Sequence, residues 1–321
     1  RVAVIVALCV ALAMGSIHAP NYEMKFLKFV QDYNKVYAND AEVETRFNIF
    51  RANVDKINEH NAKGLNWEMA INEFADQTAE EFFSTHLGAL PVFDAEVETV
   101  DLSGVVNAPS SMDWRDHGAV TGVKNQGQCG SCWSFSTTGA MEGAVEISKG
   151  RLTSLSEQQL VDCSSANYGC SGGWPYKAMD YAIKNGGLCH ESDYPYTARD
   201  GTCKKSCTPA STISSYKAVS RDNEAALLTA VAAQPVSVLI EADQSSFQFY
   251  SSGVMSGRCG TSIDHAVLAA GYGEDNGEAY WLVKNSWGAN WGEKGYIRLA
   301  RNFQSPYGQC GIATGPYYAL A

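Results

Sequence analysis

The stretch N-Q-G-Q-C-G-S-C-W-S-F, Asn125 to Phe135, places two cysteines three residues apart and a tryptophan directly after the second. A C-x-x-C pair can be a redox couple, one half of a zinc site, or a disulfide cysteine next to a reactive thiol. Each use needs different surroundings, so the choice between them decides the structure and function that we expect for the whole chain.

The N-terminus predicts entry into the secretory pathway. Arg1 is followed by the apolar run VAVIVALCVALAM, which ends at Met14, and then by small residues. This order is typical of a signal peptide, which we assign to residues 1–19 with its start incomplete. The run is shorter than the roughly 20 residues of a membrane-spanning helix, and a buried strand is the alternative. We expect a secreted protein or one in an acidic, lysosome- or endosome-like compartment.

Secretion changes how the cysteines are interpreted. Disulfides form in oxidising compartments, and an odd number of cysteines leaves one thiol unpaired and so a candidate reactive group. Nine cysteines follow the predicted signal peptide: Cys129, Cys132, Cys163, Cys170, Cys189, Cys203, Cys207, Cys259 and Cys310.

Charge divides the 321-residue chain into two parts. Residues 20–106 contain 16 acidic and 7 basic residues and no cysteine, whereas residues 107–321 contain 19 acidic and 16 basic residues. An apolar content of 45% is ordinary for a globular protein. Neither part has the excess of basic residues that a nucleic-acid-binding surface needs. We therefore expect two folded units and no nucleic-acid partner.

The N-terminal part is predicted to be mainly helical. Apolar residues recur at helical spacing over residues 22–63, and Thr78 is a suitable N-cap for a further helix over residues 79–87. Between them, residues 67–78 alternate like a short strand. Residues 88–109 lack periodicity, which predicts an exposed, extended linker that is open to cleavage.

The C-terminal part is predicted to contain a helical half followed by a sheet half. Helical stretches cover residues 131–150, 154–164 and 175–184. Gly150 is expected to end the first, and Ser156 is a suitable N-cap for the second. Apolar segments between glycine-rich turns predict strands at residues 235–242, 265–273, 279–287 and 295–302. The cleft between two such lobes is a common ligand site.

The three uses of the C-x-x-C pair differ in what else they need. A structural zinc site usually takes its ligands as two close pairs, but the histidines are scattered, at positions 18, 60, 86, 117, 190 and 265. A redox couple needs two free thiols, which leaves seven other cysteines, again an odd number, and no thioredoxin-like βαβ pattern surrounds the pair. The third use gives Cys129 to a disulfide and leaves Cys132 free, with no metal.

A free Cys132 would stand in the first turn of a helix. Unpaired backbone N–H groups and the helix dipole stabilise negative charge there, which favours a thiolate. A nearby imidazolium would lower its pKa further and pass a proton to a leaving amine. The side-chain amide of Gln126 and the backbone N–H of Cys132 would then form an oxyanion hole.

The segment NQGQCGSCWSFS resembles the active-site signature C-G-[SA]-C-[WY] of papain-like cysteine peptidases. The segments SIDHAVLAAGYG and YWLVKNSWGANWGEKGYIRLARN resemble the histidine and asparagine segments of the same family. The resemblance implies that Cys132 is the nucleophile, His265 the general acid and base, and Asn285 the residue that orients it. It also implies that Gln126 completes the oxyanion hole and that Trp287 shields the Asn285–His265 hydrogen bond from water.

The same resemblance implies a fold and an activity. We expect an α+β, papain-like two-lobe fold with a helical left lobe, a barrel-like right lobe and a cleft between them, preceded by a mainly helical prodomain. The expected activity is that of a cysteine endopeptidase made as a zymogen. The chain contains no histidine-bearing insertion of the kind that blocks the primed side in cathepsin B. No metal or organic cofactor is implied.

The N-terminal part resembles an inhibitory prodomain of the cathepsin L type. A second pattern of this prodomain, G-x-N-x-F-x-D, occurs as AINEFAD with Ala70 in place of the glycine. The resemblance implies that residues 20–106 are a propeptide whose linker runs backwards through the cleft of a peptidase domain, residues 107–321. The first pattern of this prodomain consists of six residues spaced three or four apart, so that they share one face of a helix: Glu42, Arg46, Phe50, Asn53, Ile57 and Asn61.

The resemblance also assigns disulfides and substrate-binding residues. The implied disulfides are Cys129–Cys170, Cys163–Cys203 and Cys259–Cys310, and by parity Cys189 would pair with Cys207. The residues at substrate-binding positions are Gly172, Gly173, Trp174, Pro175, Leu239, Ile263, Ala266, Trp287 and Gly315. Gly172 and Gly173 would present backbone groups to the peptide as a short strand. We expect Leu, Val or Phe at P2 to be preferred over Arg, because the S2 residues are all apolar or small: Trp174, Pro175, Leu239, Ile263, Ala266 and Gly315.

Activation and partners complete the expectations. Carboxylates that are ionised and paired in the zymogen lose that stabilisation as pH falls, so we expect acid to start self-cleavage near Val106–Pro109. Expected partners of this monomer are protein and peptide substrates, its own propeptide and cystatin-like inhibitors, with no membrane. Two other functions are open. A non-catalytic scaffold or inhibitor would typically have lost its nucleophile, and a thiol–disulfide exchanger would use Cys129 and Cys132 together.

Overall fold

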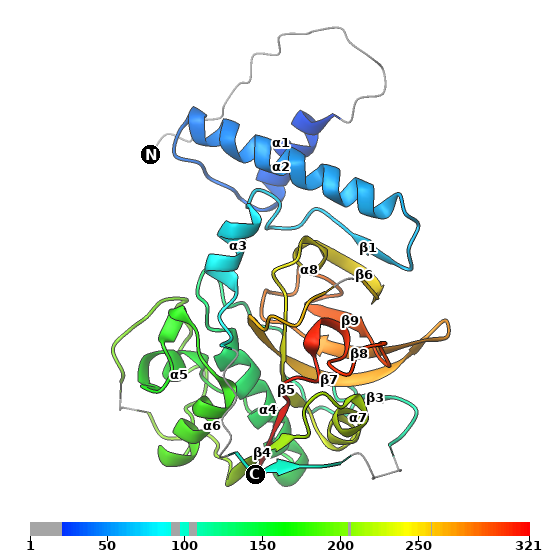
Figure 1. The fold of residues 1–321 in the computed structure, drawn as a ribbon. Coiled ribbons are helices and arrows are strands. Elements are labelled where there is room, and N and C mark those ends of the chain that lie inside the picture. The colour runs from blue at the N-terminus through cyan, green and yellow to red at the C-terminus, as the bar shows by residue number, and fades with distance from the viewer. Residues whose placement is uncertain (1–20, 91–96, 103–107, 205–206, 258) are drawn as a thin grey trace, which may run out of the picture.

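The computed structural model describes residues 21–90, 97–102, 108–204, 207–257 and 259–321. The predicted signal peptide, residues 1–19, lies outside these ranges, as does the first half of the predicted cleavage region Val106–Pro109. The described residues form a body of two lobes, one mainly helical and one built on a sheet, with a helical unit at one end (Figure 1).

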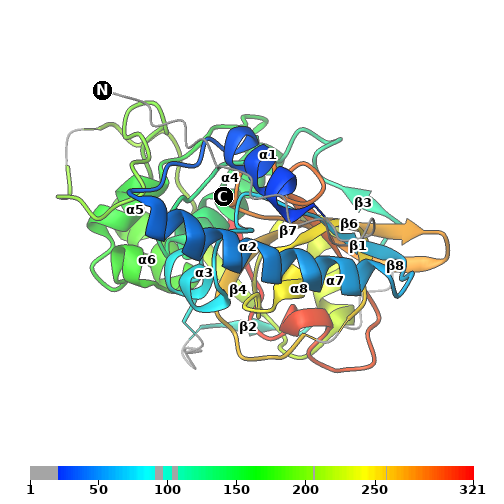
Figure 2. The ribbon, with the colours of Figure 1, turned by 90° about the horizontal axis from the view of Figure 1, so that it is seen from above.

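The helical unit begins with two crossing helices, α1 (Tyr22–Asp32) and α2 (Asp40–Asn61), which lie at the top of Figure 1 and across the body in Figure 2. The prediction of helix throughout residues 22–63 is therefore wrong in its middle. Asn34 takes a left-handed φ of 50°, and the Asn39 side chain caps the start of α2. Phenylalanine rings from both helices pack against one another.

The chain returns from α2 along the right lobe. Strand β1 (Trp67–Met69) pairs antiparallel with β6 (Tyr250–Met255), and helix α3 (Ala79–His86) then leads down to the junction of the lobes (Figure 1). The strand predicted here is shorter than expected, because the Asn72 side chain accepts a hydrogen bond from a following backbone N–H and turns the chain. The predicted N-cap of α3 is confirmed: Thr78 forms a capping box.

Three helices build the left lobe: α4 (Cys132–Lys149), α5 (Glu157–Cys163) and α6 (Pro175–Lys184), with the 3-10 turn η1 at Gly169–Ser171. They lie where helices were predicted. Helix α4 is central and buried along most of its length. A glycine in α4, Gly139, lets the right lobe approach closely, because a Cβ there would lie 2.9 Å from Leu268 Cδ2.

The right lobe is built on a sheet with short helices between its strands. The strands are β2 (Thr99–Val100), β3 (Met112–Asp113), β4 (Ser215–Val219), β5 (Val236–Ile240), β7 (His265–Asp275), β8 (Glu278–Lys284), β9 (Tyr296–Ala300) and β10 (Tyr317–Leu320). The helices are α7 (Glu224–Ala233), α8 (Ser245–Gln248) and η2 (Gln309–Gly311). The strand order is β1-β6-β9-β8-β7-β5-β10-β4-β2, with β3 paired to β7. Within the described residues this path does not close, so the barrel-like lobe has two free ends, β1 and β2.

The prediction of an exposed linker is wrong at its start. Ala89 is only 5% exposed, and the backbone of residues 88–90 is hydrogen-bonded to both lobes. Further along, β2 pairs in parallel with β4. At residues 88–90 and 99–100 the chain is extended, as predicted, but its backbone groups there bond to the body of the protein rather than to water.

Four disulfides and one free thiol account for the cysteines in the described ranges. The pairs are those that resemblance and parity implied: Cys129–Cys170, Cys163–Cys203, Cys189–Cys207 and Cys259–Cys310. Cys132 is free. Among the described residues, no group of three His, Cys, Asp or Glu side chains is placed to hold a metal ion. In the same part of the chain, no helix combines the length and apolar character that a membrane crossing requires.

Candidate active site

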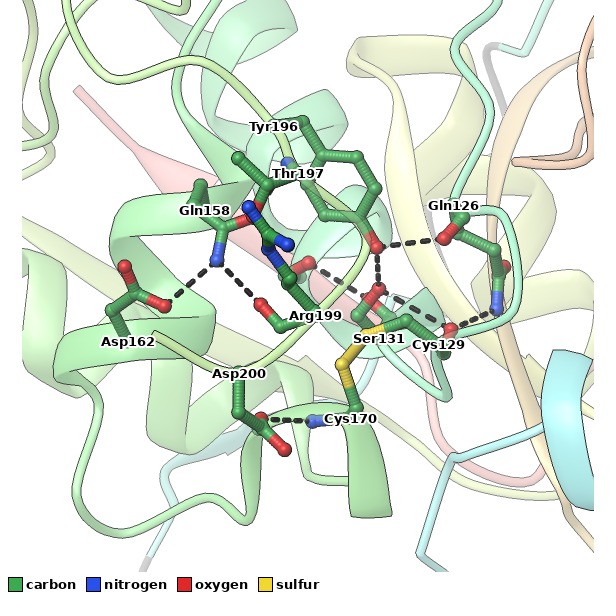
Figure 3. The surroundings of a disulfide bond; sticks show 12 residues. Gln126, Cys129, Ser131, Gln158, Asp162, Cys170, Tyr196, Thr197, Arg199 and Asp200 are labelled. Carbon is green, nitrogen blue, oxygen red and sulfur yellow. Dashed lines mark hydrogen bonds between the residues drawn. A yellow bond between two sulfur atoms is a disulfide. The ribbon is translucent and has the colours of Figure 1, made fainter. Parts of the chain in front are cut away.

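Cys132 is the first residue of α4 and is fully buried. The preceding residue, Ser131, makes no side-chain cap to the helix, so the N–H groups of its first turn are left for other acceptors. The Cys129–Cys170 disulfide fixes the loop that leads into the helix (Figure 3). The thiol therefore stands at a helix start, as the sequence predicted.

His265 and Asn285 come from neighbouring strands of the right lobe: His265 begins β7, and Asn285 follows β8. His265 Nε2 and Asn285 Oδ1 are 2.8 Å apart. Because an amide oxygen only accepts, the ring donates through Nε2, and Nδ1 carries no proton in the neutral ring. Nδ1 has no hydrogen-bond partner among the described residues, so it is available to take a proton. The next residue, Ala266, directs its backbone N–H at the Cys132 thiol.

Trp287 covers the histidine–asparagine pair. Its ring stacks on His265, with centroids 4.8 Å apart and planes inclined by 27°, and it is 0% exposed. Phe74 and Phe82 of the helical unit, the predicted prodomain, pack edge-on against it, with centroids 5.8 and 5.0 Å away. The low local dielectric strengthens the hydrogen bond beneath. In this form the prodomain covers Trp287, so it does not line an open substrate site.

The thiol and the imidazole are both neutral in this form of the chain. Burial raises the pKa of Cys132 to about 12, although nearby backbone N–H groups oppose the shift. Burial likewise lowers the pKa of His265 to about 4, and the bond to Asn285 offsets this only in part. The expected thiolate is therefore absent while the prodomain is in place. The prediction considered the helix dipole but not the loss of water beneath the prodomain.

Gln126 is fully buried, and its side chain is held at both ends. Its Oε1 accepts from Ser286 Oγ at 2.6 Å, and its Nε2 donates to the backbone carbonyls of His86 at 2.8 Å and Cys129 at 2.9 Å. The predicted oxyanion donor, Gln126 Nε2, is thus held in place, but it already donates a hydrogen bond to the His86 carbonyl of the prodomain. Sequence reasoning missed His86, because no side-chain pattern reveals the direction of a backbone carbonyl.

The prodomain lies between the lobes as a short strand. The Gly173 N–H donates to the Gly88 carbonyl at 2.8 Å, and the Gly173 carbonyl accepts from the Leu90 N–H at 3.2 Å, which makes a parallel bridge. On the opposite side, the N–H groups of Gly88 and Ala89 donate to the Asp264 carbonyl at 2.9 and 2.8 Å. The backbone of Gly173 thus pairs with an extended segment, which is the role expected for it toward a substrate.

The residues expected in the S2 pocket come from both lobes. Trp174, Leu239, Ile263 and Ala266 belong to one buried hydrophobic cluster that also contains Ala89 of the prodomain. Of the other two S2 residues, Gly315 is buried in a loop and Pro175 begins α6. Gly172, expected to bind the peptide backbone, is buried with a φ of 111°. The structure therefore brings apolar residues of both lobes together against the prodomain strand.

Three of the six pattern residues of the prodomain hold its return segment, residues 67–81, against α2. Arg46 pairs with Glu81 at 2.8 Å, and Asn53 Nδ2 donates to two carbonyls of the return segment at 3.0 and 2.9 Å. The Asn61 side chain bonds both the N–H and the carbonyl of Met69. Of the other three, Glu42 accepts from the Ala38 N–H, and Phe50 and Ile57 are buried.

The second prodomain pattern joins the prodomain to the right lobe. Asn72 Nδ2 donates to the Gln248 carbonyl at 2.7 Å. Asp76 pairs with Lys35 at 2.9 Å and accepts from the Tyr37 hydroxyl at 3.0 Å. Ala70, which departs from the family pattern, does not adopt a positive φ, so the missing glycine causes no backbone strain.

The sequence analysis missed two sets of buried ionisable residues near the site. Lys124 pairs with Glu157 at 2.6 Å and with Glu142 at 3.5 Å, and both carboxylates are almost fully buried. Burial raises the pKa of Asp264, the neighbour of His265, to about 8. No local spacing connects Lys124 with Glu142 and Glu157, because the fold brings these three residues together from distant segments.

The chain is similar to known proteins along most of its length. Residues 108–320 match the family described as "Papain family cysteine protease", and residues 26–82 match the "Cathepsin propeptide inhibitor domain". "Probable cysteine protease RD21B" of Arabidopsis thaliana is 51% identical over 87% of this chain, which spans 62% of that relative's length. "Senescence-specific cysteine protease SAG39" of Oryza sativa subsp. japonica is 45% identical over 92% of this chain and 89% of its own length.

A solved structure extends the likeness to three dimensions. "Recombinant stem bromelain precursor" has a TM-score of 0.88 and 43% identity, over 93% of this chain and 98% of that one. Its name describes a precursor, and the likeness includes the helical unit as well as the two lobes. Together with the two family matches, this shows that the chain belongs to the papain family of cysteine proteases and carries a cathepsin-type inhibitory propeptide.

Proposed function

We propose that the chain is the zymogen of an endopeptidase in which Cys132, His265 and Asn285 act together. The observation that carries the proposal is the 2.8 Å hydrogen bond between His265 Nε2 and Asn285 Oδ1. It leaves Nδ1 of the ring without a partner among the described residues. The next residue, Ala266, directs its backbone N–H at the Cys132 thiol. When the prodomain leaves, water returns and lowers the cost of charge. Proton transfer from the thiol to the imidazole is then favoured.

Catalysis follows in two halves. The Cys132 sulfur attacks the substrate carbonyl and forms a C–S bond, while the oxyanion accepts from Gln126 Nε2 and the Cys132 backbone N–H. His265 gives its proton to the nitrogen of the scissile bond, the C–N bond breaks and an acyl-enzyme is left. His265 then takes a proton from water, the resulting hydroxide cleaves the thioester, and the proton returns to the sulfur.

We propose that the S2 pocket prefers Leu, Val or Phe at P2. The support is the apolar cluster of Trp174, Leu239, Ile263 and Ala266, which already packs with a small apolar residue of the prodomain. Peptide substrates that differ only at P2 test this, with kcat/KM for Leu expected to exceed that for Arg. Equal values would reject the assignment.

We propose that acid loosens the prodomain, and the pKa shifts there support this sign. Burial acts to raise the pKa of Glu81, but its bonds to Arg46 and Thr78 prevail and lower it, so its stabilising effect is lost as pH falls through the folded pKa. Burial lowers the pKa of His86 from 6.5 to about 4, so holding that ring neutral becomes costly below pH 6.5. Burial raises the pKa of Glu73, which acts in the opposite direction. Processing of the zymogen should increase from pH 7 to pH 4, and equal processing throughout would reject the idea.

Compartment, boundaries and partners form part of the same proposal. The mature peptidase, residues 107–321, would arise by cleavage near Val106–Pro109 and would act as a monomer in an acidic compartment or outside the cell. Protein and peptide substrates and cystatin-like inhibitors are its proposed partners. N-terminal sequencing of the active enzyme locates the cleavage site.

Chemical labelling tests the assignment of the nucleophile. An epoxide peptide inhibitor should modify the processed enzyme once, at Cys132, and a Cys132→Ser zymogen should stay uncut unless another protease is added. Labelling of Cys129 as well would favour a thiol–disulfide exchanger. Neither labelling nor peptidase activity would indicate a non-catalytic scaffold.

A further inference from the structure

A tyrosine in the loop between α6 and β4 touches the two ends of the turn that precedes Cys132 (Figure 3). The Tyr196 hydroxyl lies 2.8 Å from the backbone carbonyl of Gln126 and 2.6 Å from Ser131 Oγ. The carbonyl can only accept, so Tyr196 donates its single proton there. The Ser131 hydroxyl therefore donates to the tyrosine oxygen. One phenol group thus bridges both ends of the turn.

The two ends of this turn carry the two proposed oxyanion donors. Gln126 supplies its side-chain Nε2, and Ser131 directly precedes the backbone N–H of Cys132. The turn also has an internal bond, from Gln126 Nε2 to the Cys129 carbonyl at 2.9 Å. Any shift of Gln126 relative to Ser131 would change the separation of the donors. Oxyanion stabilisation depends on donors that are fixed before the reaction.

Tyr196 is itself held from several sides. Its backbone N–H donates to Glu191 Oε1 at 2.9 Å, and its ring meets the Phe135 ring edge-on at 4.9 Å between centroids. The next residue, Thr197, donates its N–H to Gln158 Oε1 at 2.8 Å. The phenol oxygen is therefore a fixed point, placed by contacts that do not involve the cleft.

The same loop also reaches the other side of the turn. Asp200 Oδ1 accepts from the backbone N–H of Cys170, at 2.8 Å, and Cys170 is bonded to Cys129 within the turn (Figure 3). Burial raises the pKa of Tyr196 above its usual value of 10, so the hydroxyl keeps its proton and stays a donor at any pH at which the enzyme would work.

We infer that Tyr196 is a positioning residue for the oxyanion hole: its hydroxyl fixes Gln126 and Ser131 relative to each other without touching substrate. The inference rests on the proposed function, because it assigns Gln126 and Cys132 as the donors. It separates Tyr196 from residues that act on the nucleophile, since the hydroxyl contacts neither the thiol nor His265.

The test compares Tyr196→Phe with Tyr194→Phe in enzyme released from the full zymogen by the same added protease. Tyr194 lies in the same loop. Its hydroxyl also makes partly buried hydrogen bonds, to Asp162 at 2.7 Å and from the Lys204 N–H at 3.1 Å, but none to the turn. Hydrolysis of a chromogenic peptide amide measures a step that needs the oxyanion hole. Alkylation by iodoacetamide measures the nucleophile without forming an oxyanion.

For Tyr196→Phe, we expect kcat to fall by roughly 5- to 20-fold, less than the roughly 10²–10³-fold loss on removing a donor outright. KM should change less than about twofold, and the rate and pH profile of alkylation should match wild type. Tyr194→Phe should alter neither reaction. If both reactions fall together, or if kcat stays within about twofold of wild type, the inference is overturned. A wild-type enzyme without peptidase activity would instead overturn the proposed function.

Two further variants keep the test decisive if Tyr196→Phe folds poorly. Ser131→Ala removes the donor to the phenol oxygen but leaves the bond to Gln126, so it should lower kcat in the same direction and to a smaller extent. In a Gln126→Ala background, Tyr196→Phe should change kcat less than about twofold, because only one donor is left and there is no longer a separation between two donors to fix. A full effect in that background would show that Tyr196 acts elsewhere.

Discussion

Asn53→Ala in α2 should open the zymogen without touching the peptidase domain. The Asn53 side chain is 4% exposed, and its Nδ2 donates to the carbonyls of Ala75, at 3.0 Å, and Gln77, at 2.9 Å. The Ala75 carbonyl would be left buried without a donor, at a cost of about 1–3 kcal/mol. Loss of the bond to Gln77, which is partly exposed, adds about 1 kcal/mol. The free energy that holds the prodomain folded should fall by about 2–4 kcal/mol.

A change of this size raises the population of opened prodomain by roughly 30- to 700-fold, since about 1.4 kcal/mol corresponds to tenfold. We expect Asn53→Ala zymogen to process itself at a higher pH than wild type. Thermal unfolding in a Cys132→Ser background, in which self-cleavage is blocked, measures the loss directly. Asn58→Ala is the matched control, because it makes the same change at an exposed position of the same helix. Equal unfolding temperatures for the two variants would refute the reasoning.

Three other predictions concern different parts of the molecule. His86→Phe keeps an aromatic ring that cannot take a proton. Because the pKa of His86 is lowered from 6.5 to about 4, the wild-type prodomain loses about 2 kcal/mol of stability at pH 5, and the variant does not. The pH at which half of the zymogen is processed should therefore be lower for the variant, and an unchanged value would count against this role of His86. Gly143→Ala places a Cβ 2.6 Å from Pro235 Cγ and should lower stability by about 1–3 kcal/mol, whereas Gly122→Ala, with open space around it, should be neutral by thermal unfolding. Asn285→Ala frees the His265 ring and should lower kcat by roughly 10- to 100-fold with little change in KM, which steady-state kinetics can check.

The sequence alone predicted the ends of helices where the residues that cap them lie next to those ends in the chain. The side chains of Thr78 and Ser156 cap the first turns of α3 and α5, and Gly150 takes the left-handed φ of 64° that ends α4. The band of prodomain residues was predictable for a related reason. The helical period fixes which side chains share a face, so Asn53 and Asn61 could be placed together before their partners were known.

What the sequence could not provide depends on contacts between distant segments. The break after α1 follows from the left-handed φ of Asn34, which a run of helix-compatible residues conceals. The bond from Gln126 to the His86 carbonyl joins residues 40 positions apart and involves a backbone atom. The neutral state of Cys132 and His265 depends on how completely the prodomain excludes water, and no local pattern measures that.

The contacts that close the cleft are made largely by main-chain atoms, namely the carbonyls of His86 and Gly88 and the N–H groups of residues 88–90. A peptide backbone is the same for nearly every amino acid, so these bonds themselves do not depend on which side chains the segment carries. Gly88 is the exception, because a Cβ there would stand 2.1 Å from the Gly130 carbonyl oxygen. Replacing this one glycine, which a single base change can do, should therefore weaken the hold of the propeptide on the enzyme, although every other main-chain bond of the segment could still form.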